Sequence, residues 1–369
     1  MTRFVPLALS LLSVGVVAPG CKGRGPAVAE AAPPPSAPAD ARASAPAARV
    51  FGRKYGAMGT EITLSAWTAN EPAAEHAFAA GYDEIRRIEI LMTDWERPGE
   101  PESDVVRINK AAGKEAVHVS AETFEVIEKS LEMSRKSHGA FDITFAAMKG
   151  LWKFDEDLEK KIPPAAEIAR RRKLIKWTDV AVDPKARTVK LKRPGMRLGL
   201  GGIAKGYAVD RCAAVLRGEG LRDFMVQAGG DLFVAGSKGQ VKWMVGVRDP
   251  RGGPRDIIAR MTIQDHAFST AGDYERSFVL NGKRYHHIID PATGYPATAS
   301  REVTIFAPTA FLADALDDAV FILGPDKGIA LVDSFPDCST LIVDANNKVW
   351  MSKSLEGRLQ RTGNPTDGI

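Results

Sequence analysis

Three aspartates gather late in the chain, at Asp314, Asp317 and Asp318. In a helix, positions i, i+3 and i+4 lie on one face, so the three carboxylates would be neighbours. Like charges placed in this way repel one another unless a cation lies among them. The preference of acidic residues for a helix N-terminus explains Asp314 but not the other two. Oxygen-only ligands favour Mg²⁺ or Ca²⁺ over zinc, so the spacing predicts a divalent-cation site.

A second chemical pattern is the glycine-rich stretch over residues 198–210. Apolar residues alternate before Gly201 as in a strand, and helical spacing begins at Ala204, so the glycines are expected to form a strand-to-helix turn. Such a turn lets the backbone approach a ligand, and the helix N-terminus with Lys205 favours an anion. The spacing matches neither G-x-G-x-x-G nor the Walker phosphate loop. A phosphate site and a plain tight connection both remain open.

Two adjacent histidines, His286 and His287, precede an Asp-Pro-Ala-Thr-Gly turn that begins at Asp290. As strand neighbours their side chains point to opposite faces, so one can face a site while the other faces away. A histidine at a strand end is either structural or a general acid or base.

Two further residues have two interpretations each. Asp142 follows a helix stop at Gly139, and it either caps the next segment or presents an acceptor to a pocket. Trp95 stands at the edge of a polar loop; its position favours packing on the core, and the alternative is a flat face for an aromatic ring.

The elements that must position these residues show clear periodicities. Apolar residues recur at helical spacing over residues 78–92, 121–138 and from about 310 onward, and alternating strands cover residues 61–66, 224–226 and 232–235. The close succession of strands after Leu221 favours antiparallel pairing over a parallel α/β arrangement. We expect an α+β fold with helices packed on mixed, largely antiparallel sheets, in two lobes with the site in the cleft between them.

The composition is that of an ordinary globular protein: 369 residues, 44% hydrophobic, 26% charged and a net charge of +4. The basic run at residues 170–173 has no aromatic platform beside it, so it predicts a solvated helix face and no nucleic-acid partner. No cysteine spacing is typical of a metal site. Cys212 and Cys338 are expected to be two buried thiols, with one disulfide as the alternative.

The N-terminus is typical of an exported protein. Residues 1–21 predict a signal peptide, with Arg3, an apolar run and small residues before Cys21. Cys21 resembles the lipid-modified cysteine of bacterial lipoproteins, and release after simple cleavage is the alternative. Residues 22–50 are almost entirely Ala, Pro, Gly and Ser and predict an unfolded tether. The folded domain is expected over residues 51–369.

Together these motifs resemble the ordered motifs of the ApbE family, the FAD:protein FMN transferases, which are commonly exported lipoproteins. The resemblance rests on six segments in order: Met58-Gly59-Thr60, Gly139-Ala140-Phe141-Asp142, Gly201-Gly202-Ile203-Ala204-Lys205-Gly206, Gly229-Gly230-Asp231, the segment from His287 to Gly294, and Ala313-Asp314-Ala315-Leu316.

The resemblance implies a Mg²⁺-dependent enzyme that moves the FMN half of FAD onto a threonine of an acceptor protein and releases AMP. The acceptor motif of the family ends in Ser/Thr-Gly-Ala-Thr. By resemblance, His287 is the functionally important histidine. The positions that would contact FAD are Met58, Trp95, Ala140, Phe141, Asp142, Lys205, Ile288 and Ile289. The metal would be held by Asp314, Asp317, Asp318 and the carbonyl of Gly202.

Three positions depart from the family pattern: Gly199 replaces an aspartate, Asp318 a threonine and Gln227 an asparagine. The first removes an expected polar contact to FAD, and the second gives a stronger cation ligand. Two other functions stay open, an FAD pyrophosphatase that uses water as the nucleophile and a flavin-binding lipoprotein without turnover. The expected location is the periplasmic side of the inner membrane, or the periplasm itself if Cys21 is not acylated.

Overall fold

The computed structural model describes residues 47–154 and 160–369. The expected signal peptide and most of the expected tether lie outside the described residues and remain predictions. The first described strand, β1, begins at Arg49, close to the expected start of the domain. Within the described ranges, every helix is too short or too polar to cross a lipid bilayer.

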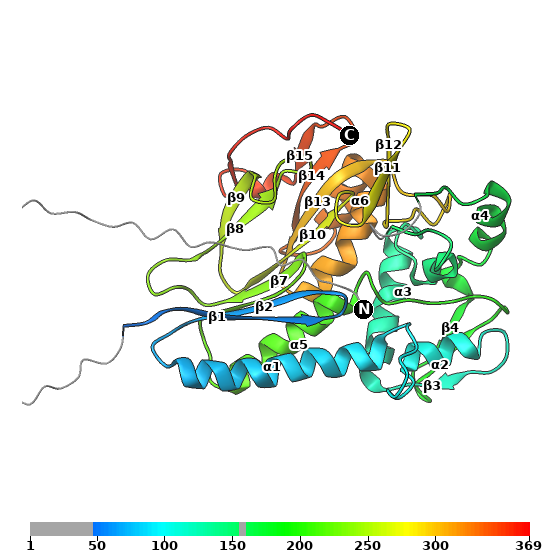
Figure 1. Cartoon of the computed structure of the whole chain (residues 1–369), viewed down its shortest axis with the longest axis horizontal. Helices are drawn as coiled ribbons and strands as arrows, with labels where there is room; N and C mark the ends of the chain where they lie inside the picture. Colours follow the sequence, from blue (N-terminus) through cyan, green and yellow to red (C-terminus); the bar gives the residue numbers. More distant parts are fainter. Residues whose placement is uncertain (1–46, 155–159) are drawn as a thin grey trace, which may run out of the picture. The chain divides into compact units, whose positions relative to one another are not determined.

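A large antiparallel sheet of eight strands forms the centre of the fold (Figure 1). Its strands, in spatial order, are β1 (Arg49–Ala57), β2 (Thr60–Thr68), β6 (Phe224–Ala228), β7 (Asp231–Ala235), β10 (His266–Gly272), β13 (Ser300–Ala307), β14 (Ser339–Asp344) and β15 (Val349–Met351). Three smaller sheets comprise β16 (Gln360–Arg361), β9 (Ile257–Ile263) and β8 (Trp243–Arg248); β3 (Val117–His118), β5 (Thr188–Leu191) and β4 (Val180–Asp183); and β11 (Ser277–Leu280) with β12 (Lys283–His286).

The middle strands of the large sheet are buried on both faces. Successive residues of each strand point to opposite sides. On one face Ala271 and Val303 belong to the main core. On the other face Phe268 and Phe306 pack with Trp243 and residues of β8 and β9 in a second core. The same alternation separates the side chain of Ser269, which faces the helices, from its neighbours in β10.

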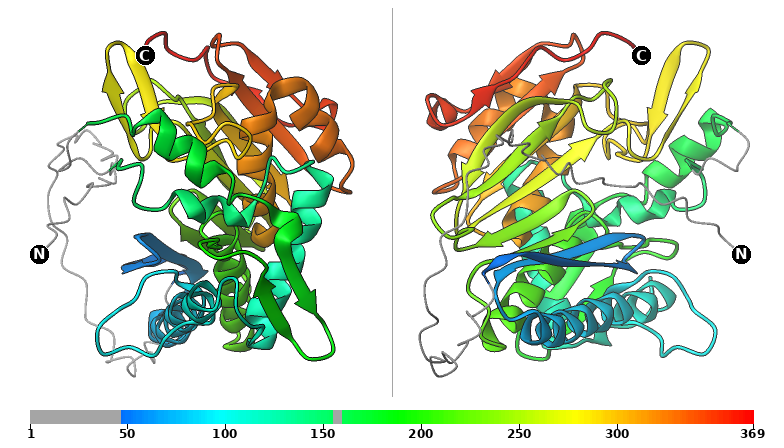
Figure 2. Two further views of the ribbon diagram at one scale, coloured as in Figure 1. Left: turned by 90° about the vertical axis from the view of Figure 1, so that its right-hand side faces the viewer. Right: turned by 60° about the vertical axis from the view of Figure 1, so that its left-hand side comes forward.

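Helices α1 (Glu71–Met92), α5 (Ala204–Gly218) and α6 (Ala310–Asp333) cover the first of these faces. The other helices are α2 (Asp104–Lys110), α3 (Ala121–Lys136) and α4 (Ala165–Arg172), with 3-10 turns η1 (Ile143–Met148), η2 (Trp177–Asp179) and η3 (Lys353–Leu355). Helix α5 packs against α1 and α6, and α6 packs on β10, β13 and β14. Figure 2 shows the β1–β2 hairpin beside α1.

Helix α6 is broken by Gly324, whose φ of 73° is non-helical, and by the following Pro325. Its N-terminus is capped by Thr309, which accepts a hydrogen bond from Leu312 N, and by Asp210, whose carboxylate accepts from Ala310 N and Phe311 N at 2.9 Å each. The expected acidic cluster lies in the half of α6 before the break.

The expected α+β class with helices on largely antiparallel sheets is confirmed, since every pairing between the described strands is antiparallel. The expected strand before Gly201 is wrong. Its residues join no described sheet, and the Asn109 side chain bonds to both Leu198 N and Leu198 O, at 2.8 and 2.9 Å. Cys212 and Cys338 are free, buried thiols, as expected.

Candidate active site

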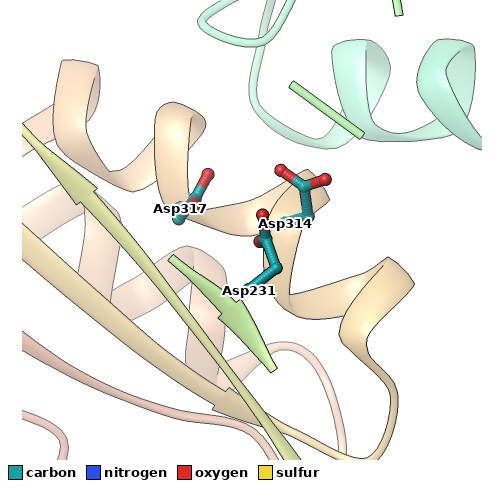
Figure 3. A group of neighbouring side chains, drawn as sticks. All are labelled: Asp231, Asp314 and Asp317. Carbon is teal, nitrogen blue, oxygen red and sulfur yellow. The ribbon is translucent and has the colours of Figure 1, made fainter. Parts of the chain in front are cut away.

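Three buried aspartates converge between the sheet and α6. Each of Asp231, Asp314 and Asp317 offers a carboxylate oxygen, and these oxygens lie within 4.8 Å of one another. Figure 3 shows Asp231 on β7 directed toward the helix that carries the other two. The structure thus brings together two of the three expected helix aspartates and adds Asp231, which the sequence motif contained but which was not predicted to hold a metal.

Lys205 supplies a positive charge to this group from the first turn of α5. Its Nζ lies 2.8 Å from Asp231 Oδ2 and 3.2 Å from Asp314 Oδ1. The backbone N–H of Gly206 donates to Asp314 Oδ2 at 2.8 Å. The N-terminal end of α5 therefore does receive an anion, as its dipole favours, but the anion in this structure is the carboxylate of α6.

Ser269, on β10, joins the strand and helix carboxylates. Its Oγ lies 2.5 Å from Asp231 Oδ1 and 2.6 Å from Asp317 Oδ2. A hydroxyl has one proton to donate, so it can donate to only one of these oxygens at a time. The second short contact is favourable when that carboxyl carries a proton or when a cation offsets the charge.

The charge of the centre is not balanced by Lys205 alone. Burial raises the pKa of Asp314 above its ordinary value, and repulsion from Asp231 adds to this effect. The pKa of Asp317 is raised by burial and then by Asp318 and Asp314. Burial opposes the charge on Lys205, but the surrounding carboxylates outweigh it and raise its pKa well above the usual value. A buried, oxygen-only and negatively charged group fits a hard divalent cation such as Mg²⁺.

Asp318 and Gly202 are the other two expected metal ligands, and they are neighbours. A Cβ placed on Gly202 would lie 2.8 Å from Asp318 Oδ2 and 3.6 Å from the ring of Phe141. A glycine at this position therefore allows the close approach of both side chains. Burial raises the pKa of Asp318, and the charge on Lys205 opposes that rise.

Asp142 takes the capping role that was one of its two interpretations. It is the N-cap of η1, and its oxygens accept hydrogen bonds from Thr144 N, Thr144 Oγ1 and Trp177 N at 2.8, 2.6 and 2.9 Å. Burial raises its pKa despite these bonds. Ala140 and Phe141 precede this cap, so the cap fixes the segment that brings Phe141 to Gly202.

The two histidines lie in different surroundings, and only His286 belongs to a strand, since β12 ends there. His286 is buried, its Nε2 lies 2.8 Å from Ala297 O, and its ring packs edge-on against Phe321. His287 Nδ1 is buried and has no hydrogen-bond partner among the described residues. Burial, with smaller contributions from His286, Arg276 and Lys205, lowers the pKa of His287 to about 3. The His287 ring is therefore neutral at pH 7, and at this pKa it is a weak base.

The segment after His287 is buried. Ile288 belongs to the main core, and its carbonyl accepts a hydrogen bond from Ala297 N at 2.9 Å. Ile289 packs with Met148 and Trp152 in a smaller cluster. A contact of this segment with FAD would therefore be made mainly by its backbone.

Met58 lies at the turn of the β1–β2 hairpin, with a left-handed φ of 52°. The hairpin reaches the glycine turn that precedes Asp231, because Gly229 N donates to Glu61 O at 3.0 Å. Gln227 Nε2 donates to Gly229 O at 2.9 Å across the same turn, so the glutamine at this position has a local structural role.

The interpretation of Trp95 as a core residue is wrong: its side chain is 64% exposed. Its ring is covered on one side by Lys149, whose Nζ lies 3.6 Å from the ring centroid. Lys149 Nζ also lies 2.7 Å from Asp94 Oδ2, and that oxygen would be 3.8 Å from a Cβ placed on Gly199. Gly199 stands where the family has an aspartate, and in this structure the carboxylate of Asp94, from another segment, lies near it.

Several known proteins are similar to this chain in sequence and in fold. The chain is 32% identical over 305 residues to an FAD:protein FMN transferase of Klebsiella pneumoniae (82% of this chain, 92% of that protein). It is 35% identical over 328 residues to one of Treponema pallidum (85% and 89%). The ApbE protein of Thermotoga maritima superimposes with a TM-score of 0.75 at 32% identity, covering 84% of this chain and 99% of that one.

The flavin transferase ApbE of Vibrio cholerae shares the fold, with a TM-score of 0.73 at 23% identity over 84% of this chain and 99% of that one. The model of the ApbE family matches residues 58–342, a range that holds all of the carboxylates, Lys205 and His287 described above. This chain therefore belongs to the ApbE family.

Proposed function

We propose that this chain transfers the FMN half of FAD to the hydroxyl of a threonine in an acceptor flavoprotein, releases AMP, and depends on Mg²⁺. Membership of the ApbE family supports a flavin transferase, and the name of the curated relatives supports FAD as the donor. The observation that carries the Mg²⁺ dependence is the buried oxygen centre of Asp231, Asp314 and Asp317 beside Lys205.

The donor set fits a resident magnesium ion. Asp314, Asp317, Asp318 and the Gly202 carbonyl are the proposed ligands, and Asp231 is a further candidate because its oxygen lies in the same cluster. When bound there, Mg²⁺ would neutralise charge on a pyrophosphate and stabilise the charge of the transition state.

Lys205, in the first turn of α5, is proposed to hold the pyrophosphate of FAD, since a cation near a helix N-terminus favours a phosphate. The acceptor oxygen would form the new bond to the flavin-side phosphorus. The bond between that phosphorus and the bridging oxygen would break, and AMP would leave with the electron pair. The hydroxyl proton would pass to the neutral ring of His287, which we propose as general base or orienting group.

The remaining proposed contacts to FAD are Met58, Trp95, the segment 140–142 and the segment 288–289. We propose from the sequence that the acceptor carries a Ser/Thr-Gly-Ala-Thr motif. We also propose that the chain is exported and anchored through Cys21 on the periplasmic side of the inner membrane.

The test is incubation of the chain with FAD, Mg²⁺ and an acceptor fragment bearing the motif, followed by a denaturing gel viewed for flavin fluorescence. A fluorescent band at the mass of the acceptor, lost with EDTA and with a Thr-to-Ala acceptor, supports the proposal. Release of FMN and AMP without a band would instead indicate a pyrophosphatase, and bound but intact FAD a carrier.

The His287→Ala variant tests the role of the histidine in the same assay. Loss of a general base is expected to slow transfer roughly 10²- to 10⁴-fold. The exposed His118 provides the matched control, and His118→Ala should transfer at the wild-type rate. A wild-type rate in His287→Ala would remove the histidine from the mechanism and leave the metal centre unaffected.

A further inference from the structure

The surface near the glycine segment carries an aromatic side chain that the fold does not need for its core. Trp95 is 64% exposed and follows directly on Asp94 in the loop after α1. Its indole offers a large, flat aromatic face beside a candidate site, on which the ring of a ligand can stack. The surroundings of its ring indicate how it is held.

Lys149 is fixed at three points. Its Nζ lies 2.7 Å from Asp94 Oδ2, donates to Asp94 O at 2.9 Å, and lies 3.6 Å from the centroid of the Trp95 ring. Its backbone N–H donates to Ala146 O at 3.0 Å at the end of η1. The ammonium group therefore contacts one face of the indole, while Trp95 as a whole is 64% exposed.

Gly199 lies next to this ion pair. A Cβ at this position would lie 3.1 Å from Ala146 Cβ and 3.8 Å from Asp94 Oδ2. The backbone of Gly199 is itself held, because its N–H donates to Ile143 O at 2.9 Å. The Asp94–Lys149 ion pair thus lies against the segment that leads to Gly202 and Lys205, and it sets the position of Trp95 relative to that segment.

We propose that Lys149 is a positioning residue for FAD. It holds Trp95 so that the other face of the indole stacks on an aromatic ring of FAD, and Asp94 holds Lys149 in turn. This inference rests on the proposed function. A ring that is already fixed loses less conformational freedom when the ligand binds, so the contribution of Lys149 should appear in FAD affinity and much less in the rate of the chemical step.

The first test compares Lys149→Met, which keeps the length of the side chain, with Lys149→Arg, which keeps the charge. The dissociation constant of FAD and the KM and kcat of flavin transfer are measured on the full chain. For Lys149→Met we expect Kd and KM to rise about three- to tenfold with kcat within about twofold, and for Lys149→Arg near-wild-type values. An unchanged Kd in Lys149→Met, or a loss that arginine does not rescue, would overturn the proposal.

Lys348 provides a matched control, because its Nζ lies 3.7 Å from the ring centroid of Trp350, which is itself bonded to an aspartate, Asp344. Lys348→Met removes a similar cation–π contact outside the candidate site, and it should leave Kd unchanged. A loss of FAD affinity in this control equal to that in Lys149→Met would count against a specific role for Lys149.

A double-mutant cycle with Trp95→Leu separates positioning from direct contact. If Lys149 acts through the indole, adding Lys149→Met to Trp95→Leu should weaken FAD binding no further. Additive losses would show that Lys149 acts without Trp95 and would overturn the proposal. The cycle reads binding alone, so a wild-type chain that binds FAD but transfers no flavin would contradict the proposed function and leave this comparison intact.

Discussion

Replacing Asp231 by asparagine tests whether the strand carboxylate belongs to a metal centre. Asparagine keeps the shape and can still accept from Ser269, but it removes one negative charge from the cluster. A ligand that binds only the folded chain stabilises it by RT ln(1 + [L]/Kd), which is about 2.7 kcal/mol at a concentration one hundred times Kd. If the variant binds Mg²⁺ about 30-fold more weakly, the same concentration gives about 0.9 kcal/mol.

The measurement is thermal unfolding of the full chain with and without Mg²⁺. For a folded unit of the size of Ala45–Ile369, 1 kcal/mol corresponds to about 1.5 °C in Tm. The increment in Tm caused by Mg²⁺ should therefore fall from about 4 °C in the wild type to about 1.5 °C in Asp231→Asn. Asp344→Asn is the control, because Asp344 is also buried and bonded, to Trp350 Nε1 at 2.8 Å, but lies outside the centre.

Two results would refute this reasoning. A wild-type chain whose Tm does not respond to Mg²⁺ would show that the carboxylates do not form a magnesium site. If Mg²⁺ raised the Tm of Asp231→Asn as much as that of the wild type, but did not raise the Tm of Asp314→Asn, Asp231 would serve only as the ion-pair partner of Lys205.

Two further predictions concern packing and pH. Gly206→Ala should lower the free energy of unfolding by roughly 2–3 kcal/mol in chemical denaturation, because the added Cβ would lie 2.2 Å from Ala310 O. Gly218→Ala is the control: it lies in the same helix with open space around it, and it should not destabilise the fold. Burial raises the pKa of Glu302 from 4.5 to about 8, so the folded chain keeps this proton between these two pH values while the unfolded chain loses it. The free energy of unfolding therefore falls as pH rises from 4.5 to about 8, by at most about 1.4 kcal/mol per pH unit. Glu302→Gln should therefore gain unfolding free energy relative to the wild type between pH 5 and 8, and a constant difference would contradict the raised pKa.

The periodic parts of the chain were predictable because their signals are local. The helical spacing that ends at Gly218 corresponds to α5, and the helix predicted from about Ala121 corresponds to α3. The acidic face of α6 was visible for the same reason, since Asp314 and Asp317 lie one turn apart. Residues that a single element brings together can be recognised from spacing alone.

The contributions that were missed come from distant segments. Asp231 lies on β7, more than eighty residues before its partners on α6, and Ser269 joins them from a third element, so no spacing connects them. The glycine pair before Asp231 was a signal in the sequence, because glycines in a strand often mark a close approach of another backbone. The structure has this approach, since a Cβ on Gly230 would lie 2.7 Å from Thr270 O. Trp95 was assigned to the core because apolar residues usually pack there, but it is exposed and contacts Lys149, fifty-four positions later.

The break in α6 at Gly324 has a consequence for how motion spreads through the molecule. The carboxylates all precede it, in a half-helix secured at its start by Thr309 and Asp210. The half that follows, beginning at Pro325, lacks the continuous backbone ladder that would transmit a disturbance upstream. Motion at the far end of this helix would therefore not pass along its backbone to the half that carries Asp314, Asp317 and Asp318.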